Sequence, residues 1–298
     1  MATMKTLNGY GFNATEFNGK AASDYLQKTD TATNSAKLGG KAPEYYIQPR
    51  NLLDNSDFRN PVNQRGKSEY SNVAYTYTID RWKTLDSGSV TVANGYIVTT
   101  NHLVQFMPKN LNGIYTAAAK MLDGTLLIAS GAIDTLSIGD GNTIQAGNDR
   151  AMSYFALRKA GSFLWAALYE GSYTAETLPP YVPKGYAAEL AECQRYYYQS
   201  FSGSSARDWD GAIIREAISA NRIADVSFPQ TMRIEKPTIT LYSPVSGGVN
   251  KISEYLSDTD VDAEAGYRSR YRFMLIRNTS EFEIGKHYAM HYTVSDDL

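Results

Sequence analysis

Ser89-Val-Thr-Val-Ala-Asn-Gly-Tyr-Ile-Val98 is the stretch that decides the fold expected of this chain. Two short runs rich in β-forming residues stand on either side of Asn94-Gly95, and this pair is typical of the tight turn of a hairpin. The stretch therefore predicts two short neighbouring β-strands. We expect the strands on either side of it to be short as well.

Short β-rich runs continue on both sides of this stretch as far as residue 169. Turn signals such as Asp123-Gly124 and Gly139-Asp-Gly141 separate them. Eight or so short strands at regular spacing over about 130 residues are typical of a sandwich of jelly-roll type. The sequence therefore predicts a jelly-roll-like β-sandwich over residues 49–180. Besides the opening stretch, the runs lie at 73–82, 103–107, 114–122, 125–133, 152–157 and 163–169.

Residues 187–198 carry the one convincing helix pattern. Their side chains favour helix, and Leu190, Cys193 and Tyr197 fall on one face at the i, i+3, i+7 spacing. A proline-rich stretch breaks the strand pattern just before them. We therefore expect a linking helix within residues 181–200, with Cys193 packed on it.

The last hundred residues return to a β pattern. Turn signals at Gly247-Gly248 and at 278–280 interrupt them. We expect a smaller C-terminal β-sandwich over residues 201–298, so that the whole chain is mainly β. The main strand candidates are 215–226, 237–242, 267–277 and 287–294.

The N-terminal segment repeats itself, because residues 13–26 return as residues 34–47. Gly19-Lys20-Ala21 matches Gly40-Lys41-Ala42 under this offset, and Tyr25 matches Tyr46. A unit this short cannot bury its own apolar face and must stack on a neighbour or on copies in other chains. Residues 1–48 are therefore expected to be a repeat-containing segment that serves assembly.

Composition and charge exclude several classes of protein. The formal net charge is −2, and basic and acidic residues are interspersed, so no basic stripe is present for a nucleic acid. The single cysteine excludes an intrachain disulfide and a zinc site built on cysteines. No signal-peptide pattern and no apolar run long enough to span a membrane is present. We expect synthesis in the cytoplasm without a signal peptide, and no membrane insertion.

The chain contains 23 tyrosines, an unusual number. Tyrosine offers a rigid ring with a polar tip, which suits stacking on the C–H faces of sugars as well as packing on half-buried strands. Trp82 and Trp165 lie in strand patterns and are expected in the core, whereas Trp209 stands between two aspartates. The candidate ligand-binding residues are Arg207, Asp208, Trp209, Asp210, Tyr242, Tyr255 and Tyr267.

Patterns for catalysis or metal binding are weak. Asp208 and Asp210 could serve a glycosidase, which needs two carboxylates across a sugar. The acidic run at 258–264 resembles a calcium loop but has Ala263 where the turn glycine should be, so a solvated loop is favoured. His287 and His291 are spaced to share one side of a strand, and half-buried strand residues are the favoured interpretation. We expect no catalytic residue, no metal site and no cofactor.

Several motifs in order along the chain resemble bacteriophage and prophage tail-fibre proteins. The motif at 38–46 resembles their repeated unit, and 51–58 with Pro61-Val-Asn-Gln-Arg-Gly66 resembles the opening of their carbohydrate-binding-like β-sandwich. The stretches 190–198 and 228–242 are similar to the helix that closes it and to a strand motif of their tip domains. The resemblance implies a trimeric fibre whose N-terminal stalk attaches to other tail or baseplate proteins of the virion.

The resemblance also implies a function for the distal β domains. It predicts a receptor-binding protein of the virion that adheres to host cell-surface glycans by non-covalent binding, and that is not an enzyme. Two alternatives remain open. One is a virion-associated glycan depolymerase, and the other is a carbohydrate-binding module of a cellular protein.

Overall fold

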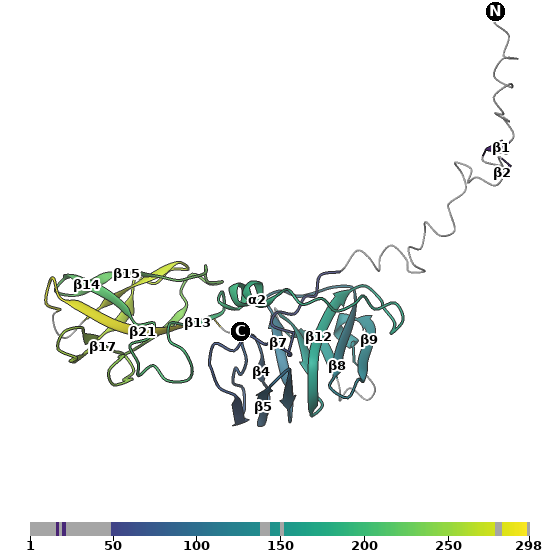
Figure 1. Cartoon of the computed structure of the whole chain (residues 1–298), viewed down its shortest axis with the longest axis horizontal. Coiled ribbons are helices and arrows are strands. Elements are labelled where there is room, and N and C mark those ends of the chain that lie inside the picture. Colours follow the sequence, from purple (N-terminus) through teal and green to yellow (C-terminus); the bar gives the residue numbers. More distant parts are fainter. Residues whose placement is uncertain are drawn as a thin grey trace, which may run out of the picture. The chain divides into compact units, whose positions relative to one another are not determined.

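The structure is a computed structural model (Figure 1). It describes residues 16–17, 20–21, 49–137, 144–149, 152–277 and 282–296. The fold is mainly β, as the sequence predicted. By its internal contacts the chain divides into one unit of Met1–Pro49 with Thr177–Pro180 and a second of Arg50–Glu176 with Tyr181–Leu298. None of the helices in the described residues is long and apolar enough to span a membrane.

A two-stranded antiparallel pair is the described structure of the N-terminal segment. It joins β1 (Glu16–Phe17) and β2 (Lys20–Ala21), with Phe17 opposite Lys20. Both strands belong to the first copy of the repeat. The second copy lies outside the described residues, so stacking of the two copies stays a prediction.

Two antiparallel sheets follow in the second unit. In the six-stranded sheet the order is β3 (Glu69–Val73), β5 (Gly88–Ala93), β6 (Tyr96–Thr99), β12 (Gly161–Glu170), β8 (Ile114–Met121), β9 (Leu126–Ala132). In the four-stranded sheet it is β10 (Ile144–Asp149), β11 (Met152–Leu157), β7 (Leu103–Met107), β4 (Lys83–Thr84). A short 3-10 helix, η4 (Ile133–Thr135), follows β9.

The predicted hairpin is confirmed. β5 and β6 pair up to Ala93 and Tyr96, so Asn94-Gly95 forms the turn. Gly95 has φ of 88°, a left-handed conformation that costs glycine little because it has no Cβ. Most other predicted runs between 103 and 169 are also strands, whereas β10 was missed.

One hydrophobic core joins the two sheets. Trp82 is fully buried, with ring centroids 5.2 Å from Phe58 and 6.1 Å from Phe155 in edge-to-face contacts. Its indole nitrogen donates to the carbonyl of Asn55 at 2.8 Å. Side chains of both sheets share this core, which is the packing of a sandwich. The jelly-roll order of the strands stays a prediction.

The predicted strand at 73–82 is wrong over most of its length. Only Val73 belongs to a strand, and residues 78–82 are buried in succession, which a strand with alternating sides does not allow. Thr78 N–H instead donates to the carbonyl of Trp82 at 2.9 Å, which closes a loop in which Arg81 has φ of 71°. The loop packs Trp82 into the core.

The predicted helix is shorter than expected. α2 (Tyr186–Cys193) is followed by three turn residues, 194–196, and β13 (Tyr197–Gln199) then pairs with the last strand. Aromatic residues favour strands, so pairing overrides the helical spacing of Tyr197. Cys193 is fully buried on the helix, as expected, and burial raises the pKa of its thiol.

The C-terminal β-structure is one nine-stranded sheet that nearly closes into a barrel, where the sequence predicted a second sandwich. Its long strand β21 (His287–Ser295) pairs with β13, β14, β16 and β17. The remaining strands are β14 (Ile213–Ser219), β15 (Arg222–Ser227), β16 (Thr238–Tyr242), β17 (Lys251–Glu254), β18 (Asp260–Asp262), β19 (Glu264–Gly266) and β20 (Arg272–Ile276). In its core Phe228 stacks on Phe273, and Tyr292 meets Phe273 edge to face.

Two predicted strands of this region are corrected. The run 215–226 is a hairpin of β14 and β15, because Ala220-Asn221 turns the chain. The run 267–277 is a strand only from Arg272 onward, since Tyr267 has φ of 45°. The runs at 237–242 and 287–294 are confirmed as β16 and β21 within a residue.

Candidate ligand-binding cavity

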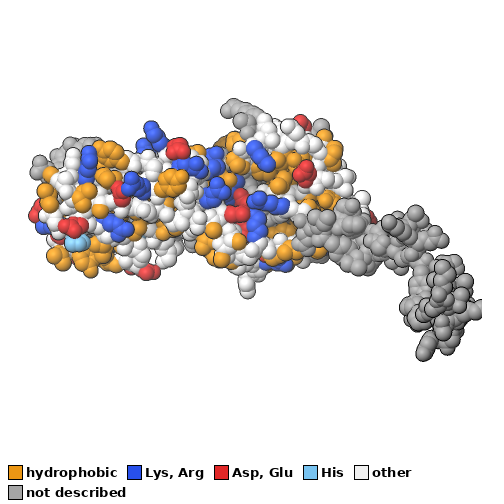
Figure 2. All heavy atoms as spheres, turned by 90° about the horizontal axis from the view of Figure 1, so that it is seen from above, with side chains coloured by type: hydrophobic (Ala, Val, Ile, Leu, Met, Phe, Trp, Pro, Cys, Tyr) orange, Lys and Arg blue, Asp and Glu red, His pale blue; other side chains and the backbone are white. Residues whose placement is uncertain are grey.

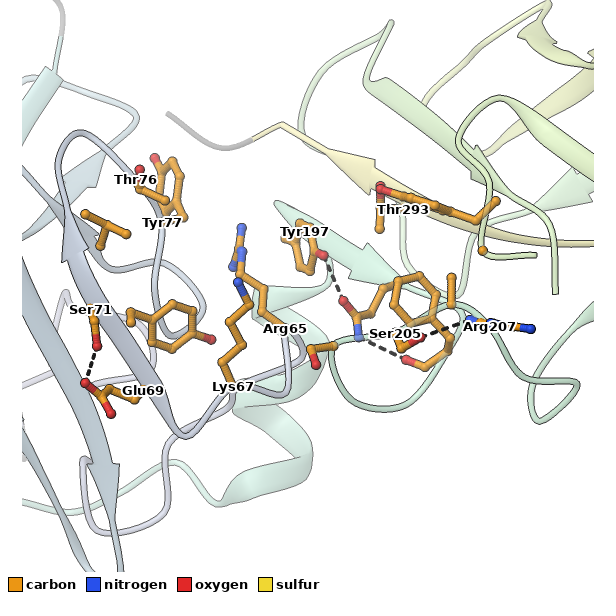
Figure 3. Close-up of a pocket in the computed structure, with 18 of the residues that line it drawn as sticks. Arg65, Lys67, Glu69, Ser71, Thr76, Tyr77, Tyr197, Ser205, Arg207 and Thr293 are labelled. Atoms are coloured by element: carbon orange, nitrogen blue, oxygen red, sulfur yellow. Dashed lines mark hydrogen bonds between the residues drawn. The ribbon is translucent and has the colours of Figure 1, made fainter. Parts of the chain in front are cut away.

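A cavity of about 670 Å³ opens in the second unit (Figure 3). One side is formed by β3 and the loops before and after it, and the other by residues 197–207, the end of β16 with the following turn, and β21. Its charged lining residues are Arg65, Lys67, Glu69 and Arg207, and its aromatic ones are Tyr70, Tyr77, Tyr197, Phe201 and Tyr242. Ser71, Thr76, Gln199, Ser204, Ser205, Ser246 and Thr293 add polar groups.

A tight turn presents Arg65 and Lys67 to the cavity. Asn63 closes it by accepting from Gly66 N–H at 3.0 Å and donating from its side chain to the Lys67 carbonyl at 2.7 Å. Gly66 has φ of 68°, and a Cβ there would lie 2.4 Å from the Cα of Gly203. The turn therefore needs glycine both for its conformation and for its close approach to the 201–205 loop.

Contacts with Tyr197 and Asp80 hold the side chain of Arg65 in place. Its guanidinium lies 3.8 Å from the centroid of the Tyr197 ring, a cation–π contact, and 3.2 Å from a carboxylate oxygen of the buried Asp80. The neighbouring Gln64 donates to the carbonyl of Tyr197 at 2.7 Å. These contacts fix the turn against β13.

Lys67 and Arg207 are the cations of the lining that no carboxylate neutralises within the described part of the chain. Both side chains are exposed. Arg207 donates from Nε to the carbonyl of Val245 at 3.1 Å, which holds it without removing its charge. Glu69 is the one carboxylate of the lining, and it accepts a hydrogen bond from the hydroxyl of Ser71 (Figure 3).

Hydrogen bonds and ring contacts hold the aromatic side chains in place. The Tyr197 hydroxyl donates to Gln199 at 2.8 Å (Figure 3). Gln199 donates in turn to the carbonyls of Phe201 and Gly203. The rings of Phe201 and Tyr242 meet edge to face at 5.7 Å. Because these rings are positioned before any ligand arrives, little ordering cost falls on binding.

Tyr70 is a further ring of the lining, and its hydroxyl donates to Asn63 at 2.5 Å. Burial raises its pKa to about 12, so it is neutral at physiological pH. The same Asn63 closes the turn below it. Tyr70 therefore couples β3 to the turn that carries Lys67.

His291 ties the 200–208 segment to β21. It is fully buried, donates from Nε2 to the carbonyl of Asp208 at 2.7 Å, and lies 3.2 Å from Ser200 Oγ through Nδ1. Its ring is 5.5 Å from that of Phe201. Burial lowers the pKa of His291, so the neutral ring is the stable form. His291 lies on a strand, as expected, but the expected half-burial is wrong for both histidines, because His291 is fully buried and His287 on the same strand is exposed.

The seven residues predicted for ligand binding fall in three places. Arg207 and Tyr242 line the cavity. Trp209 and Tyr255 lie outside its lining and meet each other edge to face at 5.7 Å, with 39% and 44% of their surfaces exposed. Tyr267 stands apart, because its hydroxyl accepts from Arg222 at 2.8 Å.

The two aspartates beside Trp209 interact locally. The side chain of Asp208 accepts the backbone N–H of Asp210 at 3.2 Å, and both residues are exposed. Neither lines the cavity. Hydrolysis at the cavity itself would lack the second carboxylate that a glycosidase needs, since Glu69 is the one acid in its lining.

The acidic run 258–264 does not converge on one point. Asp260 lies in β18 and accepts the hydroxyls of Ser243 and Ser253, while Asp262 pairs with Lys251 at 3.0 Å. Asp260 has a lowered pKa: burial opposes this, and the serine hydroxyls outweigh it. The predicted solvated loop is thus partly strand, and within the described ranges no cluster of three potential metal ligands occurs.

Sequence reasoning missed Arg65, Lys67, Tyr197 and Phe201 as site residues. A signal was present in Pro61-Val-Asn-Gln-Arg-Gly66, since a turn ending in glycine exposes the side chains around it. No protein-family model, curated protein or solved structure compared with this chain matches it.

Proposed function

We propose that this chain is a receptor-binding protein of a phage tail fibre and that it adheres to host cell-surface glycans by non-covalent binding in the cavity. The observation that carries the proposal is the lining itself. It combines five aromatic rings, several hydroxyl and amide groups, and three cations with a single carboxylate. We place the chain in the virion, as a homotrimer attached to other tail proteins through residues 1–48, by its resemblance to tail fibres.

The lining matches the chemistry of a sugar. The C–H face of a pyranose packs on an aromatic ring, and its hydroxyls exchange hydrogen bonds with polar side chains. Tyr242 is the best-placed ring, because it is only half-buried and Phe201 holds it. Thr293, Ser205 and Ser246 supply hydroxyls in the same cavity.

Binding without hydrolysis is favoured by the lone carboxylate. A glycosidase places two carboxyl groups roughly 5 to 10 Å apart across the scissile bond. Glu69 has no acidic companion among the lining residues, and its carboxylate is bonded to Ser71. An assay for new reducing ends with host polysaccharide tests this part of the proposal. Release that disappears in Asp208→Asn or Asp210→Asn would establish the depolymerase instead.

The experiment for binding compares two tyrosines of the predicted set. The full chain and its Tyr242→Ala and Tyr255→Ala variants are applied to an array of host surface glycans. Loss of a stacking ring costs more than about 1 kcal/mol in a binding site, so Tyr242→Ala should weaken binding about tenfold. Tyr255→Ala removes an equal ring outside the cavity and should leave binding unchanged.

The opposite pattern would contradict the site. If Tyr255→Ala abolishes binding and Tyr242→Ala does not, the ligand sits on the Trp209–Tyr255 pair. A chain that binds no glycan on the array would contradict the function. Light scattering at micromolar concentration tests assembly, where the proposal expects three times the mass of 33.0 kDa and a monomer would speak against a fibre.

A further inference from the structure

The charge of the cavity differs from that of the chain. The chain has a formal net charge of −2, yet the cavity lining carries three cations and one carboxylate. On the face drawn in Figure 2, basic side chains gather around the middle of the coloured part, with a few acidic side chains among them. The lining therefore carries the opposite sign of charge to the chain as a whole.

Lys67 is the cation whose charge is left for a ligand. Arg65, on the same turn, already faces Asp80 at 3.2 Å and the Tyr197 ring. Lys67 is exposed and has neither an ion pair nor a side-chain hydrogen bond in the described part of the chain. Figure 3 shows both side chains rising between the β3 side and Tyr197.

Arg207 extends the positive lining to the other side of the cavity. Its one polar side-chain contact among the described residues is the carbonyl of Val245, which is neutral. Glu69 cannot balance Lys67 and Arg207 together, because it brings one negative charge against two. A ligand with negative groups along its length would therefore gain attraction at both sides.

We propose that the ligand of this cavity is an anionic saccharide, one that carries carboxylate or phosphate groups, with Lys67 as the residue that selects for charge. This inference rests on the proposed glycan-binding function and adds the chemical class of the glycan. The ring of Tyr242 takes a sugar face, and Lys67 takes an acidic group. Carboxylate and phosphate share this recognition, so the two sources are separated by experiment.

The test uses the full chain with three defined oligomers and calorimetric titration at low salt. The first is a tetramer of α-1,4-linked galacturonate, and the second is its methyl ester, which keeps the rings and loses the charge. The third is a glycerol phosphate oligomer, which supplies phosphate. We expect at least one charged oligomer to bind about tenfold or more tightly than the ester. The advantage should shrink as salt is raised, because ions screen exposed charges.

Two lysine variants locate the effect. Lys67→Gln should weaken binding of the charged oligomer about fivefold, the range of a partly exposed ion pair, and should leave the ester unaffected. Lys236→Gln is the matched control, since Lys236 is also exposed, has no ion pair within the described residues and lies outside the cavity lining. It should bind as the unaltered chain does.

The titrations and the glycan array together distinguish failure of the anionic-ligand proposal from failure of the glycan-binding function. Equal affinity for ester and acid, or a Lys67→Gln variant that behaves like Lys236→Gln, would overturn the anionic ligand. The proposed function would still stand if a neutral glycan binds on the array. Failure of every charged and neutral glycan to bind would overturn both. Binding of one charged oligomer alone identifies carboxylate or phosphate as the source.

Discussion

The two β regions of the second unit contribute differently to the cavity. The first region, with its six- and four-stranded sheets, supplies Arg65 and Lys67 from a turn. The nine-stranded sheet and the segment leading into it supply mostly rings and hydroxyls, such as Tyr197, Tyr242 and Thr293. Lys67, the residue proposed to select for charge, therefore lies on a loop, while the aromatic rings proposed to stack on the sugar lie on or beside strands.

Their cores differ as well. The first core is closed by Trp82 against Phe58 and Phe155 and is otherwise rich in aliphatic side chains and alanine. The second depends on the contacts among the rings of Phe228, Phe273 and Tyr292. Substitutions in each region can show whether these contrasts hold, and those in the two cores should have the greatest effect on stability.

Trp82→Ala and Phe273→Ala test whether the two cores are equally well packed. Both side chains are fully buried, so each truncation should lower the free energy of unfolding by about 3–5 kcal/mol. Urea denaturation followed by circular dichroism measures both. Ile79→Val is a mild control in the first core and should cost about 1 kcal/mol. A much smaller loss for Phe273→Ala would mean that the nine-stranded sheet lacks a packed core.

Comparing Gly66→Ala with Gly95→Ala tests whether the turn at Gly66 packs against the 201–205 loop. At Gly95 alanine adds backbone strain alone, whereas at Gly66 it adds strain and a steric clash. Gly95 has φ of 88° with no atom within 4 Å of an added Cβ, so alanine should cost about 1 kcal/mol. Gly66 has the same kind of φ, and its Cβ would also collide with Gly203. We expect about 2–4 kcal/mol at Gly66 from strain plus overpacking, measured by the same denaturation. Equal costs would show that the turn does not press on the 201–205 loop.

His291 gives the nine-stranded sheet a dependence on pH. Burial lowers its folded-state pKa below the ordinary 6.5, so the unfolded chain binds the proton more tightly. Stability should therefore fall as pH drops from about 6.5 toward the lower folded-state pKa, and this group should leave stability unchanged at higher pH.

The His291→Gln variant isolates this contribution. The difference in unfolding free energy between the unaltered chain and the variant should shrink between pH 7 and pH 5, in parallel denaturation series. A difference that stays constant over this range would mean that His291 does not titrate differently in the folded state. The first region, whose described core contains no histidine, is not expected to share this dependence.

Lys67→Gln should have the smallest effect on stability. Lys67 is exposed and unpaired in the described residues, and such surface changes stay within about 0.5 kcal/mol. Thermal unfolding of the variant should coincide with that of the unaltered chain. A large loss of stability would show that Lys67 supports the turn, and its role in charge selection would then need another variant.

The first region was the more predictable from sequence. Its strands are short runs of β-forming residues separated by glycine turns such as Gly95 and Gly124, and the predicted runs 103–107 and 152–157 coincide with β7 and β11. The failure at 73–82 has a physical cause. Residues 78–82 are buried in succession because they form a loop that packs against the core. Several of them are polar, so their burial could not be predicted from residue type.

The strands of the nine-stranded sheet were harder to predict from sequence. The Ala220-Asn221 turn carries a weak signal, so β14 and β15 appeared as one strand. The short strands β17, β18 and β19 hold polar residues, such as Ser253 and Asp260, that bond to one another inside the fold. Only the tertiary structure reveals that such residues are paired.

The candidate site was predictable only in part. Arg207 and Tyr242 were named because of residue type and neighbours, and both line the cavity. Lys67 was not, because its importance depends on Tyr197 and Phe201, which lie far away in sequence. A cavity between distant segments has no local sequence pattern.

A crystal structure of the full chain with a bound oligosaccharide selected from the glycan array would test glycan binding in the cavity most directly. We predict sugar density in the cavity, with a ring packed on Tyr242 and an acidic group within about 4 Å of Lys67 Nζ, the distance of an ion pair. Sugar bound instead on Trp209 and Tyr255, with an empty cavity, would contradict this site.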